Sequence, residues 1–224
     1  MEKFSVIIRN KNEERWIGHA MQSALDFLDG PQIVVIDNNS SDESIDIVRS
    51  FRHDPALEKN EKRYSEVSIS NINDYTPGKS LNMGVQNCLF DKILVLSAHC
   101  VIKSLPDLSS ICSLIDQYGC VFGKQIPIYR GRKITPRYLW SHFADTPVVN
   151  MVSDLENRFF MHNAFCFYNK ETLLRFPFDE NIAGKEDRIW ASTYVSEGHQ
   201  YLYDPMLVTY HHYTDRGNTW KGVG

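Results

Sequence analysis

The sequence lacks several features that would mark a secreted, membrane-spanning or nucleic-acid-binding protein. Its five cysteines form no Cys-x-x-Cys pair, which argues against a disulfide framework or a structural zinc site and for a reducing compartment. The first apolar run, Phe4 to Ile8, is too short for the core of a signal peptide, and no stretch approaches the roughly 18 apolar residues of a spanning helix. The net charge of −4 gives no electrostatic reason to expect a nucleic-acid partner. We therefore expect a cytoplasmic protein, for which docking on a membrane surface stays open.

The chain also lacks the common catalytic signatures. It has no Gly-x-Gly-x-x-Gly for a dinucleotide and no His-Glu-x-x-His for a zinc hydrolase. The "GKS" at 78–80 is not a phosphate-binding loop, because that pattern needs a glycine five residues before Gly78 and position 73 is Asn. What remains is an ordinary globular composition, with 42% hydrophobic and 23% charged residues in a chain of 224. This length suits one large domain, or a core domain with a smaller lobe.

Apolar runs alternate with segments of helical periodicity along the first half of the chain. We predict strands at 4–10, 32–37, 66–70, 92–97 and 120–129, and helices at 12–28, from about 41 to 51, at 79–89 and around 106–118. The pattern weakens at 130–162, where we expect a loop or small lobe over the sheet's edge. It returns as strands at 163–169 and 201–213 and a helix near 185–197. This alternation predicts an α/β fold, in which helices cover both faces of a mostly parallel sheet.

Polar residues follow three of the predicted strands. They lie at Arg9–Glu13, Asp37–Asp42 and Ser97–Cys100. Parallel sheets bind ligands beyond the carboxyl ends of their strands, so these segments are the first candidates for a binding site. Asp37 is placed to accept from a ribose hydroxyl or a base N–H, whereas a polar turn and a helix cap explain Asp42.

Two further segments allow both a functional and a structural interpretation. "GKEDRIW" (184–190) places Glu186 and Asp187 at a helix start, where the helix dipole alone explains acidic residues. Taken in isolation, it favours this structural role over a general base. "YHHY" (210–213) ends a predicted strand with two histidines, and His99 ends another. A metal site and ordinary surface or core histidines both stay open.

In this order, the segments resemble the inverting family 2 glycosyltransferases, which have the nucleotide-sugar-binding GT-A fold. "SVIIRNKNEERWIGHAM" is similar to the family's opening strand and helix, "VIDNNSSD" to its nucleotide-contacting element, and "PGKSLNMGV" to the stretch before the strand with Asp-x-Asp. "FFMHNAFCFYNKETLLRFPFDE" and "GKEDRIW" are similar to the acceptor-side half of a bacterial subgroup. That subgroup is often assigned to surface-polysaccharide synthesis, sometimes as rhamnosyltransferases. The similarity runs from Phe4 to about Tyr213.

The resemblance implies one GT-A catalytic domain over residues 1–224, with a nucleotide-binding half at about 1–100 and an acceptor-side half at about 101–224. The implied activity is inverting transfer of a hexosyl or deoxyhexosyl group from a UDP- or dTDP-sugar to a hydroxyl of a glycan or lipid-linked acceptor. The alternative is a nucleotide-sugar or glycan-binding protein with weakened catalysis, although an intact "GKEDRIW" argues against it. A sugar nucleotidyltransferase would need a glycine-rich basic loop after its first strand, and "RNKNEE" is not one.

The resemblance also implies roles for individual residues. Asp187 is the expected base for the acceptor hydroxyl, with Glu186 orienting the acceptor or Arg188. The other expected acceptor-side residues are Asn163, as a hydrogen-bond partner, Arg188, and Trp190, as an apolar wall for a sugar ring. Because one displacement needs a base and a stabilised leaving group but no enzyme nucleophile, Cys100 is expected to be structural. The expected donor-binding residues are Arg9, Asn12, Glu13, Asp37, Asn39, Lys79, Asn82, Ser97, Ala98 and His99.

The main departure from the family is Ser97-Ala98-His99, which stands where Asp-x-Asp would hold Mg²⁺ or Mn²⁺ against the donor's diphosphate. A serine and a histidine favour Mn²⁺ or Zn²⁺ over Mg²⁺. By analogy with relatives that use Asp-x-His and a second, distant histidine, His99 and His211 would share a divalent metal. The alternative is a metal-independent enzyme, in which His99 or basic residues such as Arg9 and Lys79 face the diphosphate.

A basic loop follows the strand at 120–129. It carries Arg130, Arg132, Lys133 and Arg137. A solvated loop is the simplest interpretation, and a grip on a phosphate is the alternative. If the acceptor is lipid-linked, this loop is the candidate contact with the cytoplasmic face of the inner membrane.

Overall fold

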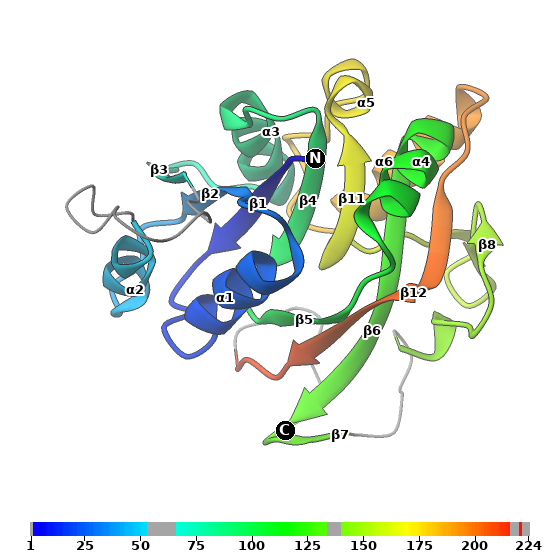
Figure 1. Ribbon diagram of the computed structural model, residues 1–224. Coiled ribbons are helices and arrows are strands. Elements are labelled where there is room, and N and C mark those ends of the chain that lie inside the picture. The colour runs from blue at the N-terminus through cyan, green and yellow to red at the C-terminus, as the bar shows by residue number, and fades with distance from the viewer. Residues whose placement is uncertain (1, 53–65, 134–139, 216–219, 221–224) are drawn as a thin grey trace.

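A computed structural model describes residues 2–52, 66–133, 140–215 and 220 (Figure 1). The first half contains β1 (Phe4–Asn10), α1 (Ile17–Phe27), β2 (Gln32–Asp37), α2 (Ser44–Ser50), β3 (Val67–Asn71), α3 (Pro77–Asn87) and β4 (Lys92–Ser97). The second half contains β5 (Cys100–Ser104), α4 (Leu108–Tyr118), β6 (Cys120–Tyr129), β7 (Arg132–Lys133), the 3-10 turn η2 (Trp140–His142), β8 (Val148–Val149), β9 (Val152–Ser153), β10 (Arg158–Phe159), β11 (Phe165–Asn169), α5 (Lys170–Arg175), α6 (Glu186–Ser196) and β12 (Leu202–His212).

The main sheet has the strand order β3-β2-β1-β4-β11-β6-β12-β5, with β7 paired to β6 and β8 to β12. β3, β2, β1 and β4 pair in parallel, as do β6 and β12. β11 runs antiparallel to both β4 and β6, and β5 runs antiparallel to β12. On this path β11 and β5 therefore run against the other strands, and the predicted mostly parallel α/β fold is confirmed.

Two apolar clusters fill the two faces of the sheet. One contains buried residues of α3, α5 and α6, and the other contains buried residues of α1, α2 and α4. Neighbouring residues of β1 serve both, because Ile7 joins the first cluster while Val6 and Ile8 join the second. Burial on both faces explains why the central strands are continuous apolar runs in the sequence.

The predicted helix at 12–28 begins later than expected, at Ile17, and has no acidic residue in its first turn. Before it, the chain forms a loop that is tied to the turn after β2. Asn12 has a φ of 54°, its backbone N–H donates to Ser40 Oγ, and its side-chain oxygen accepts from the Ser41 N–H. A contact between two loops, which no local periodicity reports, therefore sets the start of α1.

Outside the region at 130–162, two of the elements given above were not predicted. β5 has the mixed sequence "CVIKS", in which polar and apolar residues do not alternate cleanly. α5 has only six residues, and Asn169 caps it by accepting from the Glu171 N–H. Short elements of this kind are fixed by their neighbours in the fold more than by their own sequence.

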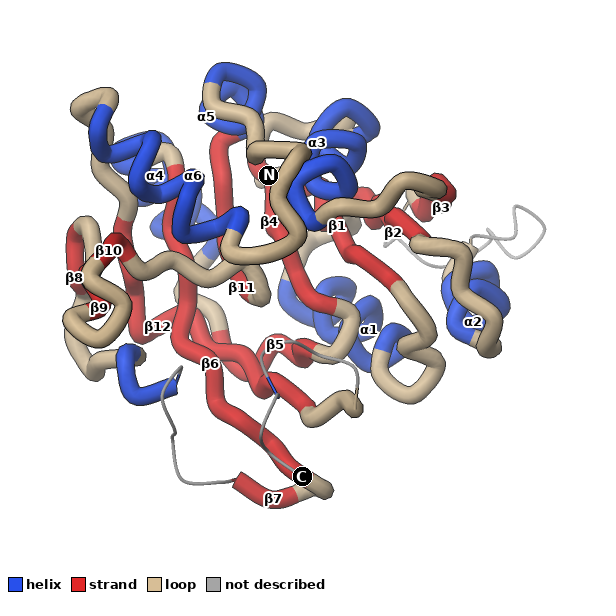
Figure 2. Tube along the Cα trace, turned by 180° about the vertical axis from the view of Figure 1, so that it is seen from behind, coloured by secondary structure: helices blue, strands red, loops and turns tan. Residues whose placement is uncertain are grey.

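The region at 130–162 forms short strands within its described part. β7 and β8 extend the main sheet, whereas β9 and β10 pair only with each other. Figure 2 shows β8, β9 and β10 gathered at one edge of the molecule, which agrees with the expected small lobe. Of the basic loop, Arg130 has its guanidinium 5.2 Å from the centre of the Tyr129 ring, and Arg137 lies outside the described residues.

The "GKS" segment is a packing contact between α3 and the chain after α5. A Cβ at Gly78 would lie 2.1 Å from the carbonyl oxygen of Asp179, so no side chain fits there. Asn82 donates to the carbonyl of Phe178 at 2.9 Å and accepts from its N–H at 3.0 Å. Both ends of the Asn82 amide are thus used within the fold, which argues against its expected role in donor binding.

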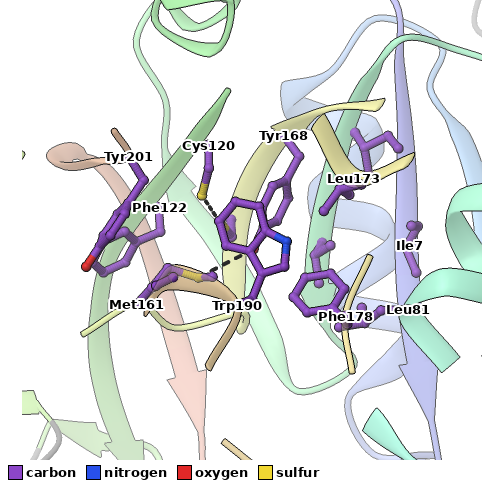
Figure 3. Close-up of a cluster of buried hydrophobic side chains, with 14 of the residues drawn as sticks. Ile7, Leu81, Cys120, Phe122, Met161, Tyr168, Leu173, Phe178, Trp190 and Tyr201 are labelled. Atoms are coloured by element: carbon purple, nitrogen blue, oxygen red, sulfur yellow. Dashed lines mark hydrogen bonds between the residues drawn. The ribbon is translucent and has the colours of Figure 1, made fainter. Parts of the chain in front are cut away.

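Trp190 lies in the core, as Figure 3 shows. It is 3% exposed, its ring stacks on Tyr194 with centroids 4.6 Å apart, and its Nε1 donates to the carbonyl of Phe176 at 2.7 Å. These contacts occupy both the ring and its N–H. They argue against the expected role of Trp190 as an apolar wall for a sugar ring. Among the described residues, no helix is both long and apolar enough to cross a membrane.

Candidate active site

The carboxyl ends of β1, β2 and β4 lie side by side. The strand register pairs Arg9 with both Ile36 and Ser97, and Asn10 with Asp37. The polar segments that follow these three strands therefore meet at one edge of the sheet, which is where a doubly covered parallel sheet binds ligands.

Asp37 holds the turn after β2. It is 3% exposed, and its carboxylate accepts from Asn10 Nδ2 at 2.8 Å, from Ser40 N at 2.9 Å and from Ser40 Oγ at 2.6 Å. These bonds use most of the roughly four acceptor positions of a carboxylate. Asn39 is exposed, has a φ of 52°, and donates to the carbonyl of Ile72 at 3.2 Å. Of these two residues, Asn39 is the more accessible to a donor.

His99 and His211 come together although 112 positions separate them, and their Nε2 atoms are 3.1 Å apart. We call them the histidine pair. Antiparallel pairing sets His211 opposite Cys100, and the N–H of His212 donates to the carbonyl of His99 at 2.9 Å. The His212 ring points elsewhere and stacks on Trp16, with centroids 4.0 Å apart. The geometry therefore agrees with the expected choice of His211 over His212.

The second ring nitrogen of each histidine has its own acceptor. His99 Nδ1 lies 3.0 Å from Glu13 Oε1, and His211 Nδ1 lies 2.7 Å from Gln125 Oε1. Each Nδ1 therefore carries a proton, and the two Nε2 atoms face each other. Burial, and after it the neighbouring His99, lowers the pKa of His211 well below its ordinary value, so this ring is neutral at pH 7.

The histidine pair fits a divalent metal. Two ring nitrogens at about 2.1 Å from one ion are about 3.0 to 3.4 Å apart for bond angles between roughly 90° and 109°, and the observed separation of the Nε2 atoms is 3.1 Å. The described residues contain no group of three or more His, Cys, Asp or Glu side chains arranged to hold a metal. An ion here would therefore draw two ligands from the part of the protein that the structure describes.

A second group of charges lies at the start of α6. We call Arg9, Glu186, Asp187 and Arg188 the ion-pair cluster. Arg9 Nη1 donates to Glu186 Oε1 at 2.9 Å, and Arg188 Nη1 donates to Asp187 Oδ1 at 3.1 Å. Glu186 thus pairs with Arg9. One of its two expected roles was to orient Arg188, but Arg188 pairs with Asp187. This pair links the end of β1 to the helix that carries the expected base.

Burial and charge act in opposite directions on the two arginines. Burial alone lowers the pKa of Arg9, but the Glu186 carboxylate outweighs it and the pKa lies above its ordinary value. For Arg188, burial is likewise outweighed by Asp187 and Glu156, and its pKa is raised. Both arginines are therefore permanent cations in a largely buried site.

Asp187 is held unevenly by its neighbours. Its Oδ1 accepts from the backbone N–H of Arg188 at 2.9 Å as well as from the guanidinium. Its Oδ2 accepts only one long bond in the described structure, from the N–H of Asn163 at 3.3 Å. The Asn163 side chain is 1% exposed, its Oδ1 accepts from Tyr168, and its Nδ2 has no partner among the described residues. Oδ2 is the oxygen of Asp187 with capacity left for another proton donor.

The remaining predicted residues are less central. Lys79 is partly exposed and lies 3.8 Å from Asp74 Oδ2. Ala98 is buried in the second apolar cluster, and Ser97 donates its N–H to the carbonyl of Ala164 at 2.9 Å. Cys100 is fully buried, and burial raises the pKa of its thiol, as suits the expected structural role.

Three residues of the site were not singled out from the sequence. Gln125 and His162 lie behind His211, and Glu156 accepts from both Arg158 and Arg188. A signal existed only for Gln125, which is an uncharged polar residue at a buried position of the mostly apolar strand β6. His162 and Glu156 lie in the weakly patterned region at 130–162. Their roles depend on contacts with residues that are distant in the sequence.

The fold is that of the GT-A glycosyltransferases. The S. aureus TarS fragment 1–349 with UDP-GlcNAc superposes with a TM-score of 0.71 at 20% identity, covering 100% of this chain and 62% of that one. GalNAc-T7 with UDP, GalNAc and Mn²⁺ gives 0.66 at 16%, covering 96% and 44%. The mannosyltransferase PcManGT from Pyrobaculum calidifontis with GDP-Man and Mn²⁺ gives 0.63 at 13%, covering 96% and 58%. The chain thus spans about half of these proteins' length.

The family follows from the sequence itself. The model of glycosyl transferase family 2 matches residues 5–180, and the chain belongs to that family. No curated protein sequence matches it. The match covers the whole expected donor side and ends before α6, so the ion-pair cluster extends beyond the matched region.

Proposed function

We propose that the protein is an inverting glycosyltransferase that moves a hexosyl or deoxyhexosyl group from a UDP- or dTDP-sugar to a hydroxyl group. One observation carries the proposal. The Arg9–Glu186 ion pair joins the end of β1, where a nucleotide sugar is expected, to the helix with the expected base. Family membership and the nucleotide sugars bound by the structural neighbours support it.

In this proposal the two halves of one catalytic domain bind different substrates. Residues from about 1 to 100 bind the donor, with the loop before α1 and the turn after β2 around the nucleotide. Residues from about 101 to 224 bind the acceptor. The division is supported by the meeting of the carboxyl ends of β1, β2 and β4, which Arg9 and Asp37 mark.

We assign Asp187 as the base. Its Oδ1 is engaged by Arg188, whereas Oδ2 has one long hydrogen bond and remains able to accept from an acceptor hydroxyl. The hydroxyl oxygen attacks the anomeric carbon as its proton moves to Oδ2, and the bond from that carbon to the diphosphate oxygen breaks. Because attack and departure occur on opposite faces, the configuration at the anomeric carbon is inverted.

We further propose that His99 and His211 hold a divalent cation, with Mn²⁺ favoured by the nitrogen ligands. Such an ion, when bound, neutralises negative charge on the departing nucleoside diphosphate. Within the chain, Glu13 and Gln125 keep the two Nδ1 atoms occupied, which leaves both Nε2 atoms to the ion. In the metal-independent alternative, His99 or Arg9 would face the diphosphate. Arg9 is engaged by Glu186, which favours the metal.

The proposal also includes the acceptor and the place in the cell where the protein acts. We propose a glycan or lipid-linked acceptor in bacterial surface-polysaccharide synthesis at the cytoplasmic face of the inner membrane. Support comes from the resemblance of the "GKEDRIW" segment to that subgroup and from the exposed Arg130 and Arg132. A binding protein without catalysis is the second candidate, for which Ser97 and His99 in place of Asp-x-Asp are the only support.

The test is Asp187→Asn. We expect UDP affinity within about twofold of wild type and a fall in turnover of about 10² to 10⁴-fold, the usual contribution of a general base. Isothermal titration calorimetry with UDP and release of UDP from a panel of nucleotide sugars measure the two quantities. Glu197→Gln, which changes an exposed carboxylate at the other end of α6, serves as the control and should change neither quantity. Undiminished turnover with the correct sugar would remove Asp187 as the base.

A further inference from the structure

Gln125 and His162 form a buried chain of hydrogen bonds behind His211. Gln125 lies on β6 next to β12 and is 2% exposed, and His162 precedes β11 and is 9% exposed. Gln125 Nε2 is 3.0 Å from His162 Nδ1, and Gln125 Oε1 is 2.7 Å from His211 Nδ1. Gln125 contacts the histidine pair, whereas His162 has no part in the proposed transfer of the sugar, so the chain as a whole needs its own explanation.

A backbone amide fixes the direction of this chain. The N–H of Ala164 donates to His162 Nδ1 at 3.3 Å. Since a backbone N–H can only donate, His162 Nδ1 carries a lone pair. Gln125 must then turn its NH₂ group to His162 and its oxygen to His211. That oxygen accepts, so His211 carries its proton on Nδ1 and a lone pair on Nε2.

The opposite direction would change the histidine pair. If the NH₂ group of Gln125 faced His211, then His211 would carry its proton on Nε2 and donate it to His99. That bond would satisfy the pair without any ion. In the direction that Ala164 selects, two Nε2 lone pairs face each other at 3.1 Å when His99 is the neutral ring that donates its Nδ1–H to Glu13. Two facing lone pairs repel each other and attract a cation.

We propose that Gln125, oriented by His162 and the backbone of Ala164, is a positioning residue that holds His211 in the Nδ1–H tautomer and so prepares the histidine pair for a divalent cation. Its functional meaning rests on the metal site proposed above, whereas the tautomer is a property of the metal-free protein. Partners of this kind, which touch a ligand but not the metal, typically change metal affinity about 10- to 100-fold.

The test combines nitrogen-15 NMR of the histidine rings in the metal-free protein with calorimetric titration of Mn²⁺. In wild type we expect a protonated Nδ1 and an unprotonated Nε2 for His211. Gln125→Leu should give mixed tautomers and Mn²⁺ binding about 10- to 100-fold weaker. His162→Leu should behave in the same way.

Two variants serve as matched controls. His162→Asn places an amide oxygen where Nδ1 accepts, so we expect it to retain the wild-type tautomer and affinity. Thr209→Val removes a buried hydroxyl, which bonds the carbonyl of Val101, from the same strand as His211. It should change neither the tautomer nor Mn²⁺ binding.

The outcomes separate this inference from the proposed metal site. A wild-type His211 with its proton on Nε2, or a tautomer unchanged by Gln125→Leu, would overturn the positioning role. The wild-type spectrum decides the question even if a variant fails to fold. A tautomer that depends on Gln125 in a protein that binds no Mn²⁺ would uphold the positioning role and overturn the metal site.

Discussion

The ion-pair cluster and the histidine pair of the candidate site are held together in opposite ways. In the ion-pair cluster, groups of opposite charge meet, and each arginine contacts a carboxylate directly. In the histidine pair, two groups of the same kind meet, and acceptors behind them hold them in place. In the first grouping each charge is compensated without a ligand, and only Asp187 Oδ2 keeps capacity for another proton donor. The second brings two lone pairs together and is completed by a positive charge between them.

The difference shows which grouping is needed for the stability of the fold and which is completed by a cation. Removing one partner from a buried ion pair leaves a charge without compensation, and the fold loses stability. Removing His99 leaves the neutral ring of His211 and mainly changes what the site binds.

The largest expected effect follows from breaking the ion pair between β1 and α6. Arg9→Met leaves Glu186, whose side chain is 8% exposed, without its cation. We expect a loss of about 3 kcal/mol in the free energy of unfolding, measured by urea denaturation. Replacing both partners, as Arg9→Met with Glu186→Gln, should restore part of that loss.

An exposed ion pair provides the control. Arg49 and Asp46 pair on α2 with side chains 60% and 66% exposed. We expect Arg49→Met to change the free energy of unfolding by less than about 0.5 kcal/mol. Equal losses for Arg9→Met and Arg49→Met would show that the ion-pair cluster does not support the fold.

The histidine side of the site should respond to pH through His162. Burial, with Arg188 adding to it, lowers the pKa of His162 from 6.5 to about 3. Below pH 6.5 the unfolded chain takes up a proton that the folded protein does not. The stability from the neutral ring is therefore complete above pH 6.5 and is lost as the pH falls towards 3. Between pH 7 and 5 the loss is about 2 kcal/mol.

His162→Asn measures that contribution, because it keeps an acceptor but has no titrating ring. Its free energy of unfolding should fall by about 2 kcal/mol less than that of wild type between pH 7 and pH 5. Urea denaturation of both proteins at the two pH values gives the comparison. The same pH dependence in both would mean that His162 is not held neutral.

The smallest expected effect concerns the ligand. We expect Mn²⁺ to strengthen UDP binding to the wild-type protein about tenfold relative to a chelator, or about 1.4 kcal/mol. His99→Ala should abolish this difference, because one of the two nitrogens is gone. His212→Phe, which alters the neighbouring ring stacked on Trp16, should retain it. Identical UDP affinity in all conditions would exclude the histidine pair as a metal site.

The sequence predicts the strands well because burial on both faces makes them continuous apolar runs. β1, β2, β4 and β6 have the expected bounds. The contribution of Asp37 and Ser97 to one edge of the sheet follows from the same logic, since parallel strands end together. The closeness of His99 and His211 was expected only from the resemblance to a family, since no local pattern connects positions 112 residues apart.

Prediction from the sequence fails where contacts between distant segments determine the role of a residue. Trp190 has an ordinary helical position, and only the packing of Tyr194 and the carbonyl of Phe176 shows it to be a core residue. Gln125 is a polar residue on a buried strand, and its role depends on which histidines its neighbours on other strands supply. Such roles are properties of strand pairing, and composition or periodicity cannot report them.

The pairing of β5 with β12 also determines which changes in chain length the site tolerates. A bulge shifts the register between Val208 and Thr209, and after it regular pairing places His211 opposite Cys100. Because successive residues of a strand point to opposite faces, one residue inserted after the bulge would turn His211 away from His99. One residue gained or lost between Asp204 and Val208 falls where the pairing of β12 with β6 is already irregular. Related chains should therefore vary in length on one side of the bulge and keep a constant length on the other.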